Sequence, residues 1–337
     1  MTDTPEIVPV EAEEYAAIED RFAALLSTRH DLVVLQGEAA LPLEAAARGL
    51  ARPGSRALNL VTSPYGAAFG DWLRQGGSTV TDLVLPFDRA VPPEQVTEAL
   101  RREAADVVSL VHAEAASGVA NPLHEIAAAA RAAGALVVVD AVASVGAEPL
   151  RIDEWGLDVV ILSAQKALDG PTGVSAVVVS DRAWAHLAAN PGAPRHSLLS
   201  LLDWRERWLT TGRAVLPVIP HHVELRLLGS ALARAEAEGL ATVVGRHRAA
   251  AQAARRGLVE LGLEPWVADP AEAAGIATTF RLPAGTTVST ILKRLDGSAR
   301  RLVGPAPAAP TEALRINHTG RRATREDVET ALAALAG

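Results

Sequence analysis

The sequence predicts an α/β protein whose large domain is built on a mainly parallel sheet and whose smaller C-terminal domain is also α/β. Short runs rich in Val and Leu alternate with alanine-rich helical stretches, and these runs are apolar throughout. Such strands are buried on both faces, which is typical of parallel sheets covered by helices. A chain of 337 residues is long enough for a sizeable core and two domains.

The large domain is expected to begin with an amphipathic helix over residues 11–28, with Ile18 and Phe22 on one face. Strands are then predicted at residues 31–35, 57–61, 106–111, 135–140, 158–162 and 174–179. Helices between them include residues 43–50, 93–103 and 123–133. Because ligands bind beyond the carboxyl ends of parallel strands, Gly37, Asp140 and Lys166 are expected at one crevice.

The pattern changes at a loop signal over residues 190–194. A long helical region is expected from His221 to about Gly262, followed by a smaller alternation of strands and helices. Those elements are predicted at residues 276–282, 288–295, 313–316 and 325–335. We therefore divide the chain into a large domain, residues 1–220, and a linking helix with a small domain, residues 221–337.

Composition excludes several classes of function. The formal net charge of −8 argues against nucleic acid or an anionic membrane as partner. The absence of cysteine excludes disulfides, thiolate nucleophiles and Cys-based metal sites. No metal site is expected at His221 and His222 either, since adjacent helical residues face different ways. No apolar run has transmembrane length and the N-terminus is acidic, so a cytoplasmic location is the expectation.

Lys166 and Asp140 are the strongest candidates for chemistry. Each follows an apolar run, and the chain has very few lysines. A lysine can form an imine with a pyridine-ring aldehyde, while a carboxylate keeps the ring nitrogen protonated. Burial lowers the pKa of a lysine, which favours the reactive amine. The alternatives are a solvated lysine at a strand end and an aspartate that caps the next turn.

Two further side chains complete the candidate site. Tyr65 lies in the loop expected after the second strand, where its ring could stack on a pyridine ring. Arg315 lies on a late strand of the small domain, and arginine binds carboxylates through two parallel hydrogen bonds. Simple packing is the alternative for the tyrosine, and a surface ion pair is the alternative for the arginine.

Four segments resemble the class V aminotransferases of pyridoxal phosphate fold type I, the alanine/serine–glyoxylate group. They read VHAEAASGV (111–119), VVDAVAS (138–144), SAQKAL (163–168) and LRINHTG (314–320). The resemblance implies a seven-stranded large-domain sheet, and a homodimer or homotetramer. It also makes Lys166 the imine lysine, Asp140 the pyridine partner, Tyr65 the stacking ring and Arg315 the carboxylate clamp. His112 and Glu114 would orient the loop beneath the ring.

Glu38 stands where this family normally offers small or hydroxyl residues to the cofactor phosphate. Two like charges about 4 Å apart cost roughly 4 kcal/mol at an effective dielectric near 20, enough to weaken binding about a thousandfold. Gln165 corresponds to a position that touches the phosphate in relatives. The alternative is that Glu38 points to solvent from a helix N-terminus.

The turn over residues 36–38, with Glu38 in it, is similar to that of a branch of the family that uses unphosphorylated pyridoxamine and pyridoxal as substrates. In that reading Glu38 accepts a hydrogen bond from the free 5′-hydroxymethyl group. The resemblance then implies amino transfer between pyridoxamine and pyruvate, with no tightly bound cofactor. One alternative is a pyridoxal-phosphate-dependent enzyme acting on a small amino acid. The other is a vitamin B6-binding protein without turnover.

Overall fold

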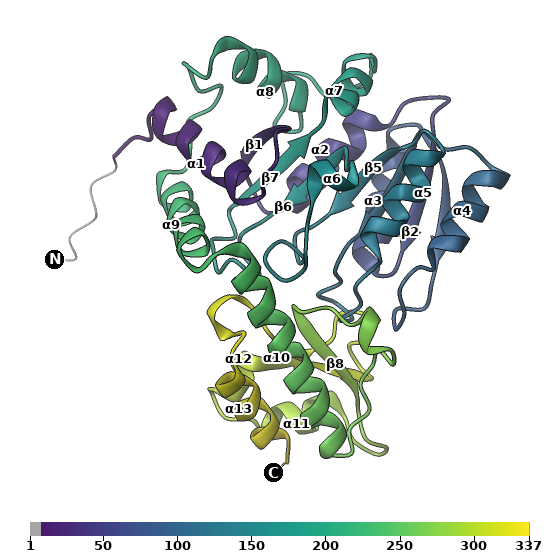
Figure 1. Ribbon diagram of the computed structural model, residues 1–337, viewed down its shortest axis with the longest axis vertical. Coiled ribbons are helices and arrows are strands. Elements are labelled where there is room, and N and C mark those ends of the chain that lie inside the picture. The colour runs from purple at the N-terminus through teal and green to yellow at the C-terminus, as the bar shows by residue number, and fades with distance from the viewer. Residues whose placement is uncertain (1–7, 337) are drawn as a thin grey trace.

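The computed structural model describes residues 8–336, and a seven-stranded sheet forms the centre of its larger part (Figure 1). The strand order is β1-β7-β6-β5-β4-β2-β3, and β7 is the strand that runs antiparallel to its neighbours. The predicted mainly parallel sheet is therefore confirmed. Its strands are β1 (Asp31–Gln36), β2 (Arg56–Val61), β3 (Thr79–Val84), β4 (Val107–Val111), β5 (Leu136–Asp140), β6 (Val159–Leu162) and β7 (Val174–Val179).

Helices cover both faces of this sheet, so the central strands are buried on both sides. Every residue of β4, β6 and β7 is buried, which explains why these strands read as continuous apolar runs. The helices are α1 (Ala12–Leu25), α2 (Ala40–Leu50), α3 (Pro64–Gln75), α4 (Pro93–Arg102), α5 (Leu123–Ala132), α6 (Ile152–Trp155), α7 (Asp181–Ala188) and α8 (Leu201–Arg207).

Strand β3 and helix α3 are among the elements of the large domain that were not predicted from the sequence. Strand β3 lies at the edge of the sheet and all six of its residues are exposed or half-buried, so it lacks an apolar run. Helix α3 begins with Ser63 as its N-cap and Pro64 in its first turn, both ordinary signals of a helix start. The expectation that Tyr65 lies in a loop is therefore wrong, because Tyr65 belongs to the first turn of α3.

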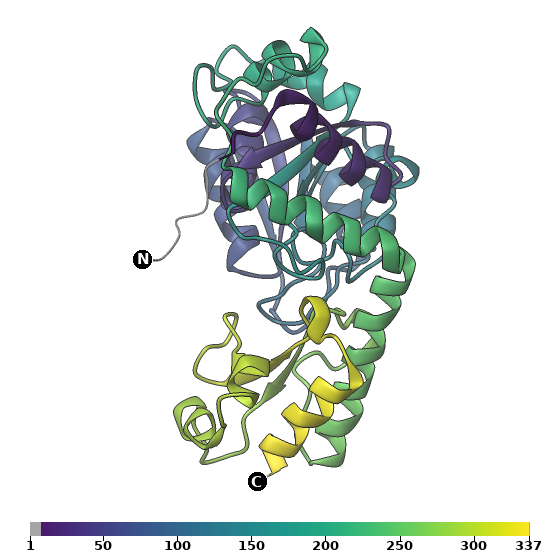
Figure 2. The ribbon, with the colours of Figure 1, turned by 90° about the vertical axis from the view of Figure 1, so that its left-hand side faces the viewer.

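The C-terminal part carries a three-stranded antiparallel sheet in the order β8-β10-β9. The long helical region is two helices, separated at Gly239, whose φ of 83° interrupts the helix. The first packs against α1, and the second runs down along the small sheet (Figure 2). The remaining elements are α9 (His222–Glu238), α10 (Leu240–Glu260), β8 (Ala277–Arg281), α11 (Val288–Arg294), α12 (Ala299–Leu302), β9 (Val303–Pro305), β10 (Ala313–Asn317) and α13 (Arg325–Ala336).

Leu225, Leu228 and Leu232 of α9 are buried in the core of the large sheet, so this helix joins both parts of the chain. The division at residues 220 and 221 accordingly stays a prediction. Short 3₁₀ helices complete the described chain: Leu209–Thr211, Pro270–Glu272 and Gly320–Arg322. No helix within residues 8–336 has both the length and the apolar composition needed to cross a bilayer.

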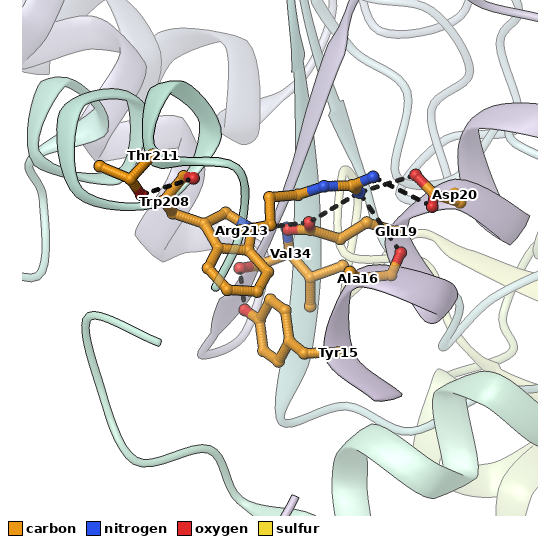
Figure 3. Close-up of polar contacts among 8 residues, drawn as sticks. All are labelled: Tyr15, Ala16, Glu19, Asp20, Val34, Trp208, Thr211 and Arg213. Atoms are coloured by element: carbon orange, nitrogen blue, oxygen red, sulfur yellow. Dashed lines mark hydrogen bonds and ion pairs between the residues drawn. The ribbon is translucent and has the colours of Figure 1, made fainter. Parts of the chain in front are cut away.

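A buried cluster fixes the segment after α8 onto helix α1 (Figure 3). The ring of Tyr15 stacks on Trp204 and meets Trp208 edge-on, with centroids 5.8 and 5.6 Å apart. The carboxylate of Glu19 accepts hydrogen bonds from Val34 N, at 3.0 Å, and from Trp208 Nε1, at 2.8 Å. Both tryptophans therefore pack against helix α1 of the same chain.

Arg213 also turns back onto α1 and donates to both carboxylate oxygens of Asp20, at 2.7 and 3.1 Å. In relatives of the family that the sequence resembles, the segment corresponding to residues 211–217 is expected to reach toward a second subunit. The backbone φ of Arg213, 56°, follows the left-handed Gly212 and returns the side chain to its own protomer. Val215 and Ile219 beyond it are 73% and 95% exposed.

Replacing Glu19 with Gln should destabilise the protein, because both oxygens accept hydrogen bonds from buried donors and an amide has one oxygen. We expect a loss of about 1–3 kcal/mol in the free energy of unfolding, measured by urea denaturation at pH 5. The surface substitution Asp20→Asn is the control and should cost about 1 kcal/mol or less. Equal stability of wild type and Glu19→Gln at pH 5 would contradict this assignment.

The wild type should also lose part of this advantage as the pH rises. Burial raises the pKa of Glu19 to about 7, against hydrogen bonds from Trp208 and Val34 that lower it. The folded state therefore binds more protons than the unfolded state between about pH 4.5 and pH 7, and stability falls with rising pH over that window. The stability difference between wild type and Glu19→Gln should be smaller at pH 8 than at pH 5.

Candidate active site

The carboxyl ends of the parallel strands surround one cavity in the large domain. Strands β4, β5 and β6 end in register, with Val111 beside Asp140 and Asp140 beside Ile161. Five of the six residues proposed from the sequence line this cavity. They are Glu38 after β1, Tyr65 after β2, Asp140 at the end of β5, and Gln165 and Lys166 after β6.

Lys166 lies at the cavity wall, half-buried, in the turn that follows β6. Burial lowers the pKa of its amine, and the nearby positive charge of Arg315 lowers it further. The carboxylates of Glu38 and Asp140 act in the opposite direction. A lysine with a lowered pKa has more of the neutral amine near pH 7, and that form reacts with a carbonyl carbon.

Asp140 both caps a turn and faces the cavity, so the two interpretations of this residue are compatible. Its Oδ1 accepts a hydrogen bond from Val142 N at 3.0 Å. Burial raises its pKa to about 6; the Val142 N–H and Lys166 oppose this shift, and Glu38 adds to it. Neighbouring groups offset the negative charge of this buried carboxylate only in part. It therefore suits a cationic ligand group, such as a protonated pyridine nitrogen.

Glu38 is held at the cavity by two hydrogen bonds. Its Oε2 accepts from Ala40 N and its Oε1 accepts from Gln165 Nε2, each at 2.8 Å. The side chain therefore interacts with the N-terminus of α2 and also lines the cavity. A phosphate at this helix N-terminus could use the same backbone N–H and Gln165 amide, and the carboxylate already bonds to both.

The aromatic ring of Tyr65 is available to a ligand. The side chain is 52% exposed and lines the cavity from the first turn of α3. Ser63 Oγ accepts the Tyr65 N–H at 3.2 Å, which fixes the backbone at this position. Simple packing, the alternative, does not describe a ring that is half in solvent.

Arg315 approaches the cavity from the small domain without lining it. It lies on β10, and its Nη1 donates to the carbonyl oxygen of Ala115, a residue of the cavity wall. Its Nε is buried without a hydrogen-bond partner, and burial lowers the pKa of the guanidinium. Among residues 8–336 it forms no ion pair, so it is not the surface pair considered from the sequence. It remains able to bind a carboxylate.

Glu114, expected from the sequence only to orient a loop, is a residue of the cavity wall. Its side chain is fully buried, lines the cavity and lies near Asp140. Thr62, which contacts it, was not identified from the sequence at all. A carboxylate between small apolar residues, in the run HAEAASG, was the available signal.

The donor set fits a pyridine aldehyde or amine better than a phosphorylated one. The cavity presents an amine with a lowered pKa, a buried carboxylate that lacks a full counter-charge, and an exposed aromatic face. At the N-terminus of α2, where an anion would otherwise bind, it presents the carboxylate of Glu38.

Comparison with known proteins identifies the family to which this chain is similar. The family model for class-V aminotransferases matches residues 10–323. Pyridoxamine–pyruvate transaminase of Mesorhizobium japonicum is 33% identical over 329 residues, which cover 96% of this chain and 82% of that protein. The crystal structure of pyridoxamine–pyruvate aminotransferase from Mesorhizobium loti superimposes with a TM-score of 0.90 at 32% identity, covering 97% of this chain and 83% of that one.

An alanine–glyoxylate aminotransferase from Nostoc sp. has a TM-score of 0.89 at 23% identity, covering 98% of this chain and 89% of its own. At that identity the likeness supports the fold alone. Together these matches confirm the predicted fold type I.

Proposed function

Because this chain belongs to the class-V aminotransferase family, we propose that it transfers an amino group between unphosphorylated pyridoxamine and pyruvate, giving pyridoxal and alanine. The observation that carries this proposal is the position of Glu38. Its carboxylate is bonded to Ala40 N and Gln165 Nε2, the donors that would otherwise serve a phosphate. The relative from Mesorhizobium japonicum is named a pyridoxamine–pyruvate transaminase, which is the same reaction.

Charge explains why this arrangement selects against a phosphate. A phosphate next to Glu38 would place like charges about 4 Å apart, which costs roughly 4 kcal/mol at an effective dielectric near 20. It would also compete with the carboxylate for the same two donors. A neutral hydroxymethyl group instead donates a hydrogen bond to the carboxylate and leaves both existing bonds in place.

Each of the other candidate side chains has its own role in the proposed reaction. Asp140 holds the ring nitrogen protonated, and the bound ring then supplies the electron sink that amino transfer requires. Tyr65 covers one face of the ring, and the Lys166 amine carries a proton between the two carbon atoms that exchange it. Arg315 binds the carboxylate of the keto acid through its guanidinium, displacing the carbonyl of Ala115. Gln165 holds Glu38 in place.

A second candidate is a pyridoxal-phosphate-dependent aminotransferase acting on a small amino acid. The alanine–glyoxylate aminotransferases among the relatives favour it, with identities such as 29% over 327 residues for that of Callithrix jacchus. It requires Glu38 to leave both hydrogen-bond donors and turn outward. The two bonds seen here oppose that movement.

The proposal extends to a homodimer or homotetramer. Val215 and Ile219 are exposed apolar residues in the segment that follows Arg213, and burying them against a second copy would remove them from water. Sedimentation at micromolar concentration tests this: a species of one chain, 35.1 kDa, would reject it.

Titration of the purified protein tests the choice between the two candidates. We expect protein without cofactor absorbance that binds pyridoxal, with affinity for pyridoxal phosphate about a thousandfold weaker. Absorbance and fluorescence changes report each Kd separately. Protein that purifies with tightly bound pyridoxal phosphate would reject the proposed substrate and favour the second candidate.

A further inference from the structure

Glu114 carries an unused hydrogen-bonding group into the cavity wall. It follows β4 and its backbone is fixed in a tight loop, with Glu114 N donating to Val119 O and Gly118 N donating to Glu114 O, both at 2.7 Å. Its Oε1 accepts from Thr62 Oγ1 at 2.7 Å. Its Oε2 is buried without any hydrogen-bond partner. Native proteins seldom leave such an oxygen unsatisfied unless a ligand or water meets it.

A chain of hydrogen bonds determines which oxygen of Glu114 can carry a proton. The backbone N–H of Val91 donates to Asn121 Oδ1 at 2.9 Å, which fixes the orientation of the amide. Asn121 Nδ2 then donates to Val111 O at 2.8 Å and to Thr62 Oγ1 at 3.0 Å. The Thr62 hydroxyl accepts from Asn121, so its own proton goes to Glu114 Oε1. A neutral Glu114 therefore carries its proton on Oε2.

The surroundings of Glu114 favour that neutral form. Burial raises its pKa to about 7, the hydroxyls of Ser63 and Thr62 oppose the shift, and the charge of Asp140 adds to it. Ser63 forms no hydrogen bond to Oε2, which stays unsatisfied. An ionised Glu114 would place an uncompensated negative oxygen in a buried site close to Asp140. Asp140 faces it from β5, and Glu38, Tyr65 and Lys166 line the same cavity.

We propose that Glu114 binds the pyridine ligand as a neutral acid, with its Oε2–H donating a hydrogen bond to the 3-oxygen of the ring. This inference rests on the proposed function, which assigns the ring nitrogen to Asp140, the 4-substituent to Lys166 and the hydroxymethyl group to Glu38. The methyl group cannot accept a hydrogen bond. The 3-oxygen is then the ring acceptor that the other side chains leave without a partner.

The variant Glu114→Gln separates a donating acid from an anion. An amide oxygen accepts from Thr62 as Oε1 does, and the amide nitrogen donates from the place of Oε2 at every pH. The probe is 4-deoxypyridoxine, which keeps the 3-oxygen but has no aldehyde to react with Lys166. Calorimetric titration of the full-length protein at pH 6 and pH 8.5 gives the affinities.

We expect Glu114→Gln to bind within about threefold of wild type at pH 6 and about tenfold more tightly than wild type at pH 8.5. The wild-type carboxyl loses its donor proton as the pH rises through about 7. Other titrating groups act on both proteins alike, so the comparison isolates Glu114. The control Glu148→Gln alters a buried carboxylate whose oxygens both have partners, Gly275 N and Arg248, and should keep the wild-type pH dependence.

A second measurement tests which ligand atom is bound. Glu114→Ala should weaken 4-deoxypyridoxine about tenfold at pH 6, and should weaken the analogue lacking the 3-hydroxyl less than about threefold. Melting by circular dichroism identifies a variant that fails to fold, in which case the Gln variant and the two ligands decide. Equal losses for both ligands, or a Glu114→Gln variant as pH-dependent as wild type, would overturn the inference. A wild type that binds no pyridine ligand would overturn the proposed function as well.

Discussion

Replacing Lys166 with Ala should lower the rate of amino transfer by a factor of about 10²–10⁴ or more, the largest effect expected of any single substitution in this chain. We propose Lys166 as the amine that reacts with the ring aldehyde and carries the transferred proton. Its pKa is lowered by burial and by the charge of Arg315, so the reactive neutral form is present at lower pH than for a solvated lysine. Turnover with pyridoxamine and pyruvate measures the loss.

The chain provides a matched control for this experiment, because Lys293 on α11 is its other lysine and is exposed. Incubation with pyridoxal followed by borohydride should attach one label, located by mass spectrometry on the peptide that contains Lys166. Labelling should persist in Lys293→Ala and disappear from that peptide in Lys166→Ala. Its midpoint with rising pH should lie below 10.5, the ordinary lysine value. Equal labelling of both lysines would contradict the assignment.

Replacing Glu38 with Ser should raise the affinity for pyridoxal phosphate by about a hundredfold to a thousandfold and weaken the binding of pyridoxal. The substitution removes a like charge worth roughly 4 kcal/mol at an effective dielectric near 20. It also frees Ala40 N–H and the Gln165 amide, which now bond to the carboxylate. Parallel titrations with the two ligands give the ratio of their Kd values.

Two controls separate the local effect of Glu38 from a change in total charge. Glu38→Gln removes the charge but keeps the volume, so it should give part of the gain in phosphate affinity. Glu44→Gln removes the same charge from α2, where Glu44 pairs with Arg48 rather than lining the cavity, and should leave the preference unchanged. An unchanged ratio in Glu38→Ser would show that the carboxylate does not exclude the phosphate.

Much of the large domain could be predicted because its central strands are buried on both faces. The runs over β4, β5 and β6 are continuous apolar segments, and each ends near a polar side chain at the cavity. The edge strand β3 was not predicted because none of its residues is buried, so it has no continuous apolar run. Helix α3 was not predicted because its N-terminal residues Ser63 and Pro64 also resemble a loop signal. For the same reason Tyr65 was expected in a loop rather than in a helix.

The sequence by itself determined which chemical groups this protein holds: an amine at Lys166, carboxylates at Asp140 and Glu38, and a guanidinium at Arg315. They follow from local composition, because burial of a strand and the polar residue at its end are properties of neighbouring positions. Only the tertiary structure decided how those groups are bonded. Gln165 reaches Glu38 across 127 residues, and Arg315 reaches Ala115 across 200.

The same holds for the Asn121, Thr62 and Glu114 chain, whose members lie 59 and 52 residues apart along the chain. Hydrogen bonds of this kind depend on strand order and register, which bring distant side chains to within 3 Å, and no local pattern encodes that distance. The sequence thus determined the set of reactive groups. The fold decided which oxygen of Glu114 accepts a hydrogen bond and which has no partner, and it bonded Glu38 to Ala40 N and Gln165.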